Sequence, residues 1–269
     1  MPTLITSAAN PLVKRMRLLA DRKHRRREGA FVVEGIQPVW QAVEAGAEVE
    51  TLVVAPALLE SAPALAMVAE QEKAGTRVAW VSPELFARVS GRDGPSGLAA
   101  IVRGHLAGLA ELHVPPGAVF VALYEIANPG NLGTIIRTAS AAGAAGVVLL
   151  GTATDPYDPA AVRASIGALF SVPIAHVGEP GEFFEWAAGA GVVVVTTSAS
   201  AQTSFWEASY PRPVAFLLGP EGPGLPPEVL SRGDQQVHIP MVGTAESLNV
   251  AVAAALLLYE AKRQRPSPG

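Results

Sequence analysis

The chain is 269 residues long, with 49% hydrophobic residues, 16% charged residues and a net charge of −4. This composition is too apolar for a disordered chain, and we find no run of about 18 uncharged apolar residues that would predict a membrane span. The first residues lack the apolar core of a signal peptide, so we expect a soluble, cytoplasmic protein. The absence of cysteine excludes disulfides, thiolate metal sites and cysteine nucleophiles, and the five scattered histidines predict no metal site.

Positive charge is concentrated near the N-terminus. Residues 1–30 carry eight lysines and arginines but only two acidic side chains, whereas the rest of the chain is acidic overall. The run RKHRRR at residues 22–27 places like charges side by side, which costs stability unless an anion lies nearby. Nucleic acid is therefore the leading partner, with a solvated surface helix as the alternative on charge alone.

The first hundred residues alternate between strand-like and helical patterns. Strands are predicted at residues 31–33, 50–55, 78–81 and 98–102, and helices near 36–45, 58–74 and 83–89. This alternation predicts a small layered αβ domain over residues 1–104. Residues 105–117, which end in Pro115-Pro116-Gly117, are the predicted linker to a second domain at 118–269.

The second half of the chain has longer apolar runs. Strands are predicted at residues 119–124, 147–150, 192–197, 214–219 and 237–240. Because these runs are almost continuously apolar, they indicate parallel strands that are buried on both faces. The final helix, in SLNVAVAAALLLYEAKRQR, is apolar on all sides, which predicts either a subunit interface or a fully internal helix.

The segment NPGNLGTIIRTASAAG lies between a predicted strand and a predicted helix. Asn131 is the expected helix cap and Gly143 the expected end. Arg137 points away from the apolar stripe of this helix, either as an ordinary exposed arginine or as a cation that faces an anionic ligand. The loop has no GxGxxG pattern and no acidic residue ends the next strand, which disfavours NAD binding or an ordinary methyltransferase fold.

Two further segments place polar residues directly after strands. LLGPEGPGLPPEVL brings Gly219 and Glu221 to a turn, and ESLNVAVAAALLLYE brings Ser247 and Asn249 to the start of a helix. Taken singly, these residues are typical of a solvated turn and of helix caps. Taken together with Asn131, they predict a site for a nucleotide-like ligand at the carboxyl edge of the sheet.

These three segments resemble motifs 1, 2 and 3 of the SpoU (TrmH-type) branch of the SPOUT RNA methyltransferases. The stretch AVRASIGALFSVPI is also similar to the region of that family between motifs 1 and 2, and the resemblance covers about residues 118–262. The sequence ITSAANPLVKRMRLLADRKHRRREGAFVVEG resembles, more weakly, the substrate-binding domain of the family, which is similar to ribosomal proteins that bind kinked RNA.

The resemblance implies 2′-O-methylation of a ribose in structured RNA, with S-adenosyl-L-methionine as the methyl donor. It also implies an α/β fold with a deep trefoil knot in the C-terminal domain and a homodimer formed through that domain. The residues that match the catalytic motifs are Asn131, Arg137, Glu221, Ser247 and Asn249. Those expected to hold the cofactor are Leu218, Gly219, Ile239, Met241 and Leu248. Those expected to meet RNA are Arg25, Arg26, Arg27, Arg163 and Ser165.

The role of Arg137 follows from the chemistry that the resemblance implies. A ribose hydroxyl must lose its proton as the methyl group leaves a sulfonium, but arginine is a poor general base because its pKa exceeds about 12. We therefore predict that Arg137 positions the hydroxyl and stabilises charge, and the proton acceptor stays open.

The sequence leaves the exact substrate open. Two-domain members of this family most often act on large-subunit (23S) rRNA, so rRNA is favoured and tRNA is the alternative. A non-catalytic RNA-binding protein on the same scaffold is the first rival, and a generic αβ enzyme that acts on a small nucleotide is the second. The intact motifs disfavour the first rival, and the basic run disfavours the second.

Overall fold

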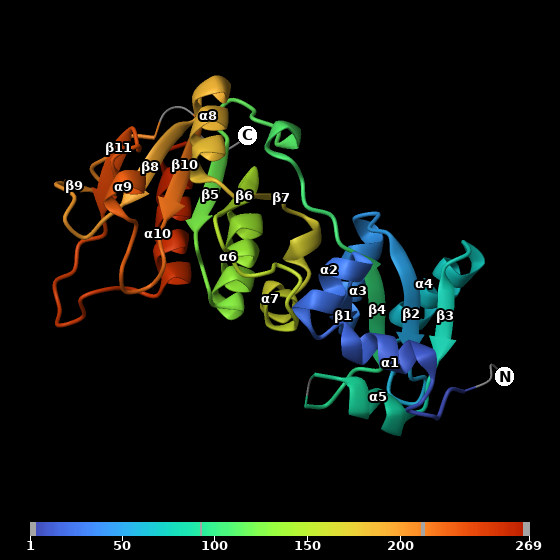
Figure 1. Ribbon diagram of the computed structural model, residues 1–269. Coiled ribbons are helices and arrows are strands. Elements are labelled where there is room, and N and C mark those ends of the chain that lie inside the picture. Colours follow the sequence, from blue (N-terminus) through green and yellow to red (C-terminus); the bar gives the residue numbers. More distant parts are fainter. Residues whose placement is uncertain (1–3, 92, 211–212, 266–269) are drawn as a thin grey trace. The chain divides into compact units, whose positions relative to one another are not determined.

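The structure, a computed structural model, describes residues 4–91, 93–210 and 213–265. The chain forms two compact units (Figure 1). The first unit comprises the chain up to His105 together with Asp155–Phe170, and the second comprises Leu106–Thr154 together with the chain from Ser171. The chain therefore returns to the first unit after the second has begun. None of the described helices is long and apolar enough to cross a lipid bilayer.

The first unit is built on a four-stranded mixed sheet with the strand order β1-β4-β2-β3. β4 lies antiparallel to β1 and β2, and β2 lies parallel to β3. The strands are β1 (Ala30–Glu34), β2 (Val49–Val54), β3 (Arg77–Trp80) and β4 (Leu98–Arg103). The helices and one 3-10 turn are α1 (Pro11–Leu18), α2 (Arg22–Glu28), α3 (Ile36–Glu44), α4 (Ala62–Lys73), α5 (Pro83–Val89), α7 (Pro159–Ser165) and η2 (Ala168–Phe170).

The predicted strands and helices between residues 31 and 102 are confirmed to within a few residues. The basic run RKHRRR forms α2, which begins after Asp21 because the carboxylate of Asp21 accepts hydrogen bonds from the backbone N–H groups of Lys23 and His24. The helix ends at Gly29, whose φ of 62° is the left-handed conformation that glycine adopts readily.

The second unit is built on a seven-stranded sheet with the strand order β7-β6-β5-β10-β8-β11-β9. Every strand pair in it is parallel, so the predicted parallel sheet is confirmed. The strands are β5 (Val119–Tyr124), β6 (Gly146–Leu150), β7 (Ile174–Val177), β8 (Val193–Thr197), β9 (Thr203–Ser204), β10 (Val214–Leu218) and β11 (Gln235–His238). The helices and one 3-10 turn are η1 (Leu109–Glu111), α6 (Pro129–Ala142), α8 (Pro180–Ala190), α9 (Pro227–Leu230) and α10 (Val250–Arg263).

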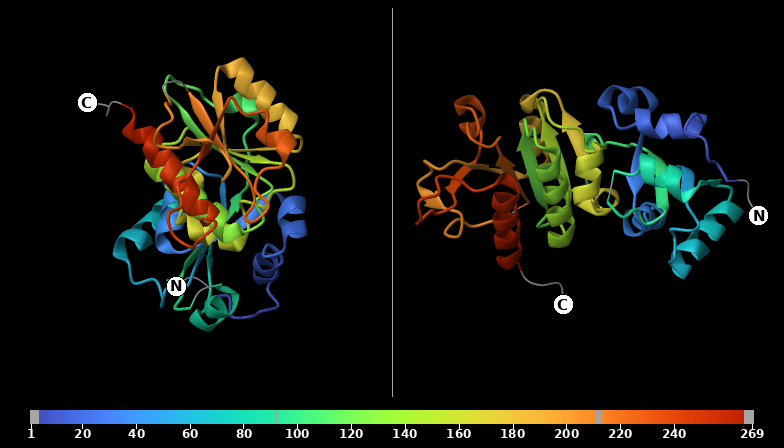
Figure 2. Two further views of the ribbon diagram at one scale, coloured as in Figure 1. Left: turned by 90° about the vertical axis from the view of Figure 1, so that its left-hand side faces the viewer. Right: turned by 90° about the horizontal axis from the view of Figure 1, so that it is seen from below.

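Helices cover both faces of this sheet. α6 and α10 pack against each other on one face, and α8 lies on the other (Figure 2). On the α8 side, Phe120, Ala122 and Leu217 of the central strands form one buried cluster with Phe183 and Ala187 of the helix. Because the strands are covered on both faces, a ligand can reach the sheet only at its edges, and the loops after the carboxyl ends of the strands are the usual site in open α/β sheets.

Candidate active site

A pocket of about 410 Å³ lies at the carboxyl edge of the parallel sheet in the second unit. It is lined by the last residues of three strands: Thr197 of β8, Leu218 of β10 and His238 of β11. The remaining walls come from the loops after β8 and β10, from the segment between β11 and α10 and from the start of α10. The residues predicted to hold the cofactor all line this pocket, namely Leu218, Gly219, Ile239, Met241 and Leu248.

Gly219, the first residue after β10, allows a close approach of two backbone segments. A Cβ atom at this position would lie 2.6 Å from the backbone carbon of Gly224 and 2.6 Å from the backbone nitrogen of Leu225. Backbone atoms cannot move aside as the end of a flexible side chain does, so only glycine fits here without a shift of the loop. The loop 219–225 is therefore folded tightly back onto the end of β10.

Three of the predicted catalytic residues meet in one hydrogen-bonded cluster. Oε1 of Glu221 accepts hydrogen bonds from Nδ2 of Asn131 at 2.9 Å, from Nδ2 of Asn249 at 2.8 Å and from the backbone nitrogen of Val250 at 3.2 Å. Nδ2 of Asn249 also donates to Oδ1 of Asn131 at 3.0 Å. The cluster thus joins the loop after β10 to the first turns of α6 and α10, and we name it the Asn–Glu–Asn cluster.

The start of α6 explains why the side chain of Asn131 is available for this cluster. We expected Asn131 to cap the helix, and that expectation is wrong: the cap is Asn128, whose Oδ1 accepts from the backbone nitrogens of Gly130 at 2.8 Å and Asn131 at 3.2 Å. Pro129 takes the first helical position, which suits proline because its fixed φ matches the helix and its missing N–H is not needed there. Asn131 is therefore a helical residue whose side-chain amide is not used as a cap and joins the Asn–Glu–Asn cluster.

Asn249 has two tasks at the start of α10. Its Oδ1 accepts from the backbone nitrogen of Ala251 at 2.9 Å, so it is the helix cap, while its Nδ2 belongs to the Asn–Glu–Asn cluster. The carboxylate of Glu221 also faces the first N–H of α10, where the helix dipole favours a negative charge.

The structure does not bring the other two predicted catalytic residues into the cluster. Ser247 is exposed and lines the pocket. Arg137 is exposed on α6, and within the described part of the chain its guanidinium has no hydrogen-bond or ion-pair partner. Its position leaves it accessible to a large ligand, and its catalytic role stays a prediction.

The residues predicted to meet RNA lie in the first unit and differ in exposure. Arg26 and Arg27 are exposed on α2, and Arg163 is exposed on α7 with its Nη1 donating to the backbone carbonyl of Gly91 at 2.8 Å. Arg25 and Ser165, by contrast, are buried, with 4% and 1% of their surfaces exposed. Direct RNA contact by these two side chains does not fit their burial, since both are already engaged in hydrogen bonds inside the unit.

One wall of the pocket was missed by the reasoning from sequence. The end of β8 and the loop after it place Thr197, Ser198 and Ser200 against the pocket. The available signal was the polar run TTSAS at the end of the apolar run VVVV, because a polar loop after a buried parallel strand belongs to the same sheet edge as the predicted site.

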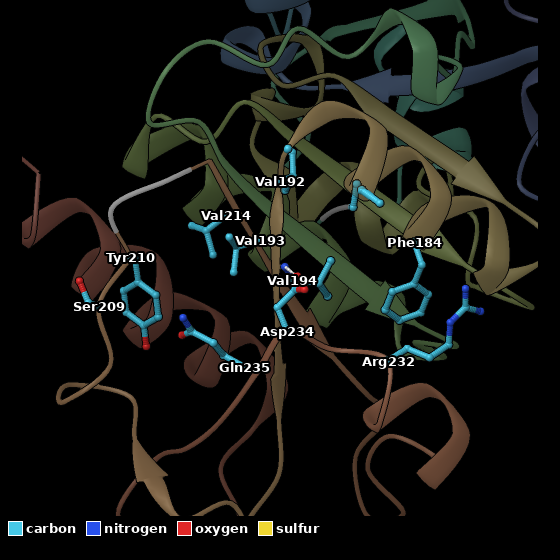
Figure 3. Close-up of a pocket in the computed structure, with 13 residues that line it drawn as sticks. Phe184, Val192, Val193, Val194, Ser209, Tyr210, Val214, Arg232, Asp234 and Gln235 are labelled. Carbon is cyan, nitrogen blue, oxygen red and sulfur yellow. Dashed lines mark hydrogen bonds between the residues drawn. The ribbon is translucent and has the colours of Figure 1, made fainter.

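A larger pocket, of about 640 Å³, lies at the opposite edge of the sheet (Figure 3). It is lined by the first residues of β8, β10 and β11, which are Val193, Val214 and Gln235. At its rim the guanidinium of Arg232 lies 4.3 Å from the ring centre of Phe184. None of the residues predicted to be functional lines it, so size alone does not identify the functional site.

Metal chemistry has no evident donor set in the described structure. Among residues 4–91, 93–210 and 213–265, no three histidine, aspartate or glutamate side chains form a group that could hold a metal ion. The polar groups beside the pocket are amides, hydroxyls, the imidazole of His238 and the carboxylates of Glu246 and Glu221, and the Glu221 carboxylate is already engaged by three N–H donors.

Comparison with known proteins agrees with this arrangement. The model of the SpoU rRNA methylase family matches residues 118–259, which contain the pocket and the Asn–Glu–Asn cluster. The chain belongs to the SpoU rRNA methylase family. A second model, an MRM3-like substrate binding domain, matches residues 10–100. The resemblance that the motifs suggested is confirmed, and so is the presence of an N-terminal substrate-binding domain.

Relatives within the SpoU family match nearly the whole chain. The chain is 36% identical to a 23S rRNA (uridine(2479)-2'-O)-methyltransferase of Streptomyces viridochromogenes, over 93% of this chain and 88% of that protein. It is 29% identical to a 23S rRNA (guanosine(2553)-2'-O)-methyltransferase of Bacillus subtilis, over 95% and 97% of the two chains. A crystal structure of an AdoMet-bound rRNA methyltransferase from Sinorhizobium meliloti matches with a TM-score of 0.90 at 37% identity, and the match covers 98% of this chain and 99% of that one.

Proposed function

We propose that this protein transfers a methyl group from S-adenosyl-L-methionine to the 2′-hydroxyl of a ribose in 23S rRNA. The observation that carries the proposal is the Asn–Glu–Asn cluster beside a pocket at the carboxyl edge of the sheet, since this is where all three family motifs were expected to meet. Two of the relatives that match over nearly the whole chain are named for 23S rRNA, which favours rRNA over tRNA as the substrate.

The pocket suits the cofactor in both size and lining. Its volume of about 410 Å³ lies within the range of roughly 300–1,000 Å³ that is usual for small-molecule sites. Leu218, Ile239 and Leu248 offer apolar surface for a purine ring, and Thr197 and Ser198 offer hydroxyl groups for its polar substituents. When bound, S-adenosyl-L-methionine supplies an electrophilic methyl group on a sulfonium sulfur.

The residues of the chain would then act by positioning. Glu221 holds the pocket loop to the starts of α6 and α10 through Asn131 and Asn249, so the site is organised before any ligand arrives. Arg137 is exposed on α6 and carries a permanent positive charge that can meet an RNA phosphate and orient the ribose hydroxyl. The 2′-oxygen would form its bond to the methyl carbon as the carbon–sulfur bond of the sulfonium breaks, and the hydroxyl proton would pass to water.

The first unit would supply the binding surface for RNA. Arg26 and Arg27 of α2 and Arg163 of α7 are its exposed cations from the predicted set. Phosphate contacts by arginine favour any RNA, whereas the fit of the unit to a folded RNA selects the target. We place this activity in the cytoplasm, where 23S rRNA is assembled in bacteria.

We also propose that the protein works as a homodimer and that the loops around the pocket form the predicted trefoil knot. Support for the dimer comes from α10, because Val252, Leu256 and Tyr259 form an exposed apolar stripe on the helix face opposite to the buried Ala254 and Leu258. Support for the knot comes from the family and from the tight return of loop 219–225 onto β10.

The decisive experiment incubates the purified protein with labelled S-adenosyl-L-methionine and either undermodified 23S rRNA or undermodified tRNA, and then maps the modified nucleotides. We expect one 2′-O-methylated ribose in 23S rRNA. Methylation of tRNA alone would show that tRNA, and not 23S rRNA, is the substrate. Binding of 23S rRNA without binding or turnover of the cofactor would favour the non-catalytic RNA-binding protein.

The role of Arg137 is tested in the same assay with Arg137→Lys. Lysine keeps the charge but loses the planar fork of the guanidinium, so we expect turnover to fall by about 100-fold if the fork orients the hydroxyl. Turnover close to that of the wild type would rule out the positioning role.

A further inference from the structure

Arg25 stands in the middle of the most basic run of the chain and is nevertheless buried. It is the only charged side chain in the described part of the chain that is almost completely removed from solvent. Its Nη1 donates to the backbone carbonyls of Leu19 at 3.0 Å and Ala20 at 2.7 Å, which follow the last turn of α1. The guanidinium therefore fixes α2 to the end of α1 and faces inward, away from solvent.

The other side of the guanidinium is held by a distant part of the chain. Nε of Arg25 donates to Oδ2 of Asp155 at 2.8 Å, and Nη2 lies 3.6 Å from Oδ2 of Asp158. Both carboxylates are rigidly placed, since Oδ1 of Asp155 accepts from the backbone nitrogen of Tyr157 at 2.9 Å and Asp158 caps α7 through the backbone nitrogen of Ala160. Arg25 thus contacts the start of the segment 155–170.

This segment also packs on the first unit through aromatic contacts. The ring of Phe31 in β1 stacks on the rings of Tyr157 and Phe170, with distances between ring centres of 4.4 Å and 6.2 Å. One side chain therefore contacts both ends of the segment. The hydroxyl of Tyr157 donates to the backbone carbonyl of His105 at 2.6 Å, and burial raises the pKa of this phenol, which keeps it protonated as a donor.

The aromatic contacts of Phe31 and the polar contacts of Arg25 constrain the position of the segment to different degrees. Stacked rings favour burial but tolerate small displacements, whereas an arginine with three hydrogen bonds and a nearby second carboxylate favours one arrangement. Buried ion pairs contribute little net stability compared with apolar residues of the same size, and their best-attested use is to fix one register among several. The contact between Arg25 and Asp155 is therefore suited to fixing where α7 lies on the first unit.

We propose that Arg25 is a positioning residue that holds the segment 155–170 in register on α2, so that Arg163 of α7 and Arg26 of α2 act as one RNA-binding surface. This inference rests on the proposed RNA-binding function of the first unit. It gives the basic run two tasks: the exposed arginines contact phosphate, and the buried arginine sets the spacing between those contacts and Arg163.

The test compares Asp155→Asn with the wild-type protein in equilibrium binding to 23S rRNA transcribed in vitro, over a series of salt concentrations. Loss of a negative charge close to RNA would by itself strengthen binding. The positioning role predicts the opposite, an affinity that is lower by about tenfold, because Arg163 is then out of register with the exposed arginines of α2. Hydrogen exchange should increase in residues 155–170, and the Kd for S-adenosyl-L-methionine should not change.

Two further variants make the result decisive. Arg25→Lys keeps the charge but loses the fork, so it should weaken RNA binding as Asp155→Asn does, whereas a mere phosphate contact would tolerate lysine. Asp158→Asn keeps a good helix cap and removes the more distant carboxylate, so it should give a smaller defect and serves as the readout if Asp155→Asn does not fold. The matched control is Arg26→Ala, which should lower the salt dependence.

Binding that is unchanged or stronger in Asp155→Asn, with residues 155–170 exchanging faster, would overturn the inference. So would wild-type affinity for RNA in Arg25→Lys, because a mere phosphate contact tolerates lysine. If the wild-type protein binds 23S rRNA without methylating it, the proposed reaction fails, but the same binding series still decides the role of Arg25. If the wild-type protein does not bind 23S rRNA, both proposals fall.

Discussion

At the scale of single residues, Glu221 is the centre of the site, because one of its oxygens serves three N–H donors from two helices. Glu221→Gln keeps an acceptor in this place but removes the charge that strengthens the hydrogen bonds, whereas Glu221→Ala removes both. We expect single-turnover methylation of 23S rRNA to fall by about tenfold in the first variant and by about 100-fold in the second. Glu185→Ala, at an exposed position of α8, is the control, and wild-type turnover of Glu221→Ala would contradict the role given to this carboxylate.

The close backbone approach at Gly219 leads to a prediction about the affinity for the cofactor, which can be measured separately from catalysis. Gly219→Ala places a methyl group against the backbone of Gly224 and Leu225, so the loop must move away from β10 and the pocket changes shape. We expect the Kd for S-adenosyl-L-methionine, measured by calorimetry, to rise by about tenfold or more. Gly189→Ala in α8 meets no atom within 4 Å and should leave the Kd as it is. Equal affinities for all three proteins would show that the close approach is not needed for cofactor binding.

At the scale of elements, α2 should dominate the salt dependence of RNA binding. Each phosphate contact contributes a slope of about 0.7–0.9 to the plot of log affinity against log salt. The variant Arg26→Ala/Arg27→Ala should therefore reduce the slope by about 1.5. The control Lys73→Ala/Arg88→Ala removes the same charge from exposed positions of α4 and α5 and should change the slope little. Equal slopes in the two double variants would show that α2 is a solvated surface helix that does not contact RNA phosphates.

The elements also indicate how far sequence reasoning reaches. Five strands of the parallel sheet could be predicted because burial on both faces leaves a continuous apolar run. β7 and β9 were missed, since β7 contains the exposed His176 and β9 has only two residues. Glu221, Ser247 and Asn249 could be assigned to one edge because they follow such apolar runs. The order of the strands could not be predicted, because apolar runs such as VAFLL of β10 and VVVTT of β8 do not indicate which strands they pair with.

Two of the predictions from sequence were wrong for different reasons: the helix cap because of a neighbouring residue, and the RNA contact of Arg25 because of a residue far along the chain. Asn128 and Asn131 are both good caps, and the choice between them depends on Pro129 taking the first helical position. Arg25 could not be told apart from Arg26 because the burial of Arg25 depends on Asp155, a residue that is remote in sequence. A charge pattern reports composition and spacing, but it does not report long-range partners.

At the scale of the whole molecule, the exposed face of α10 predicts the oligomeric state. Val252, Leu256 and Tyr259 are 48%, 38% and 50% exposed, which is unusual for three apolar side chains on one helical stripe. Leu256→Asp places a charge in the middle of this stripe, so we expect light scattering to show a dimer for the wild type and a monomer for the variant. Leu65→Asp, at a similarly exposed leucine of α4, should remain a dimer. A wild-type monomer at micromolar concentration would remove the proposed interface.

The return of residues 155–170 to the first unit also bears on how such a gene can change by recombination. An exchange of the part that encodes everything before His105 would bring in a new β1 and a new α2 without the Tyr157, Phe170 and Asp155 that pack on them. The incoming half would meet an unmatched surface, with a buried charge left alone or a ring without its neighbour. A viable hybrid must therefore inherit the stretch between β6 and β7 from the same parent as its N-terminal half.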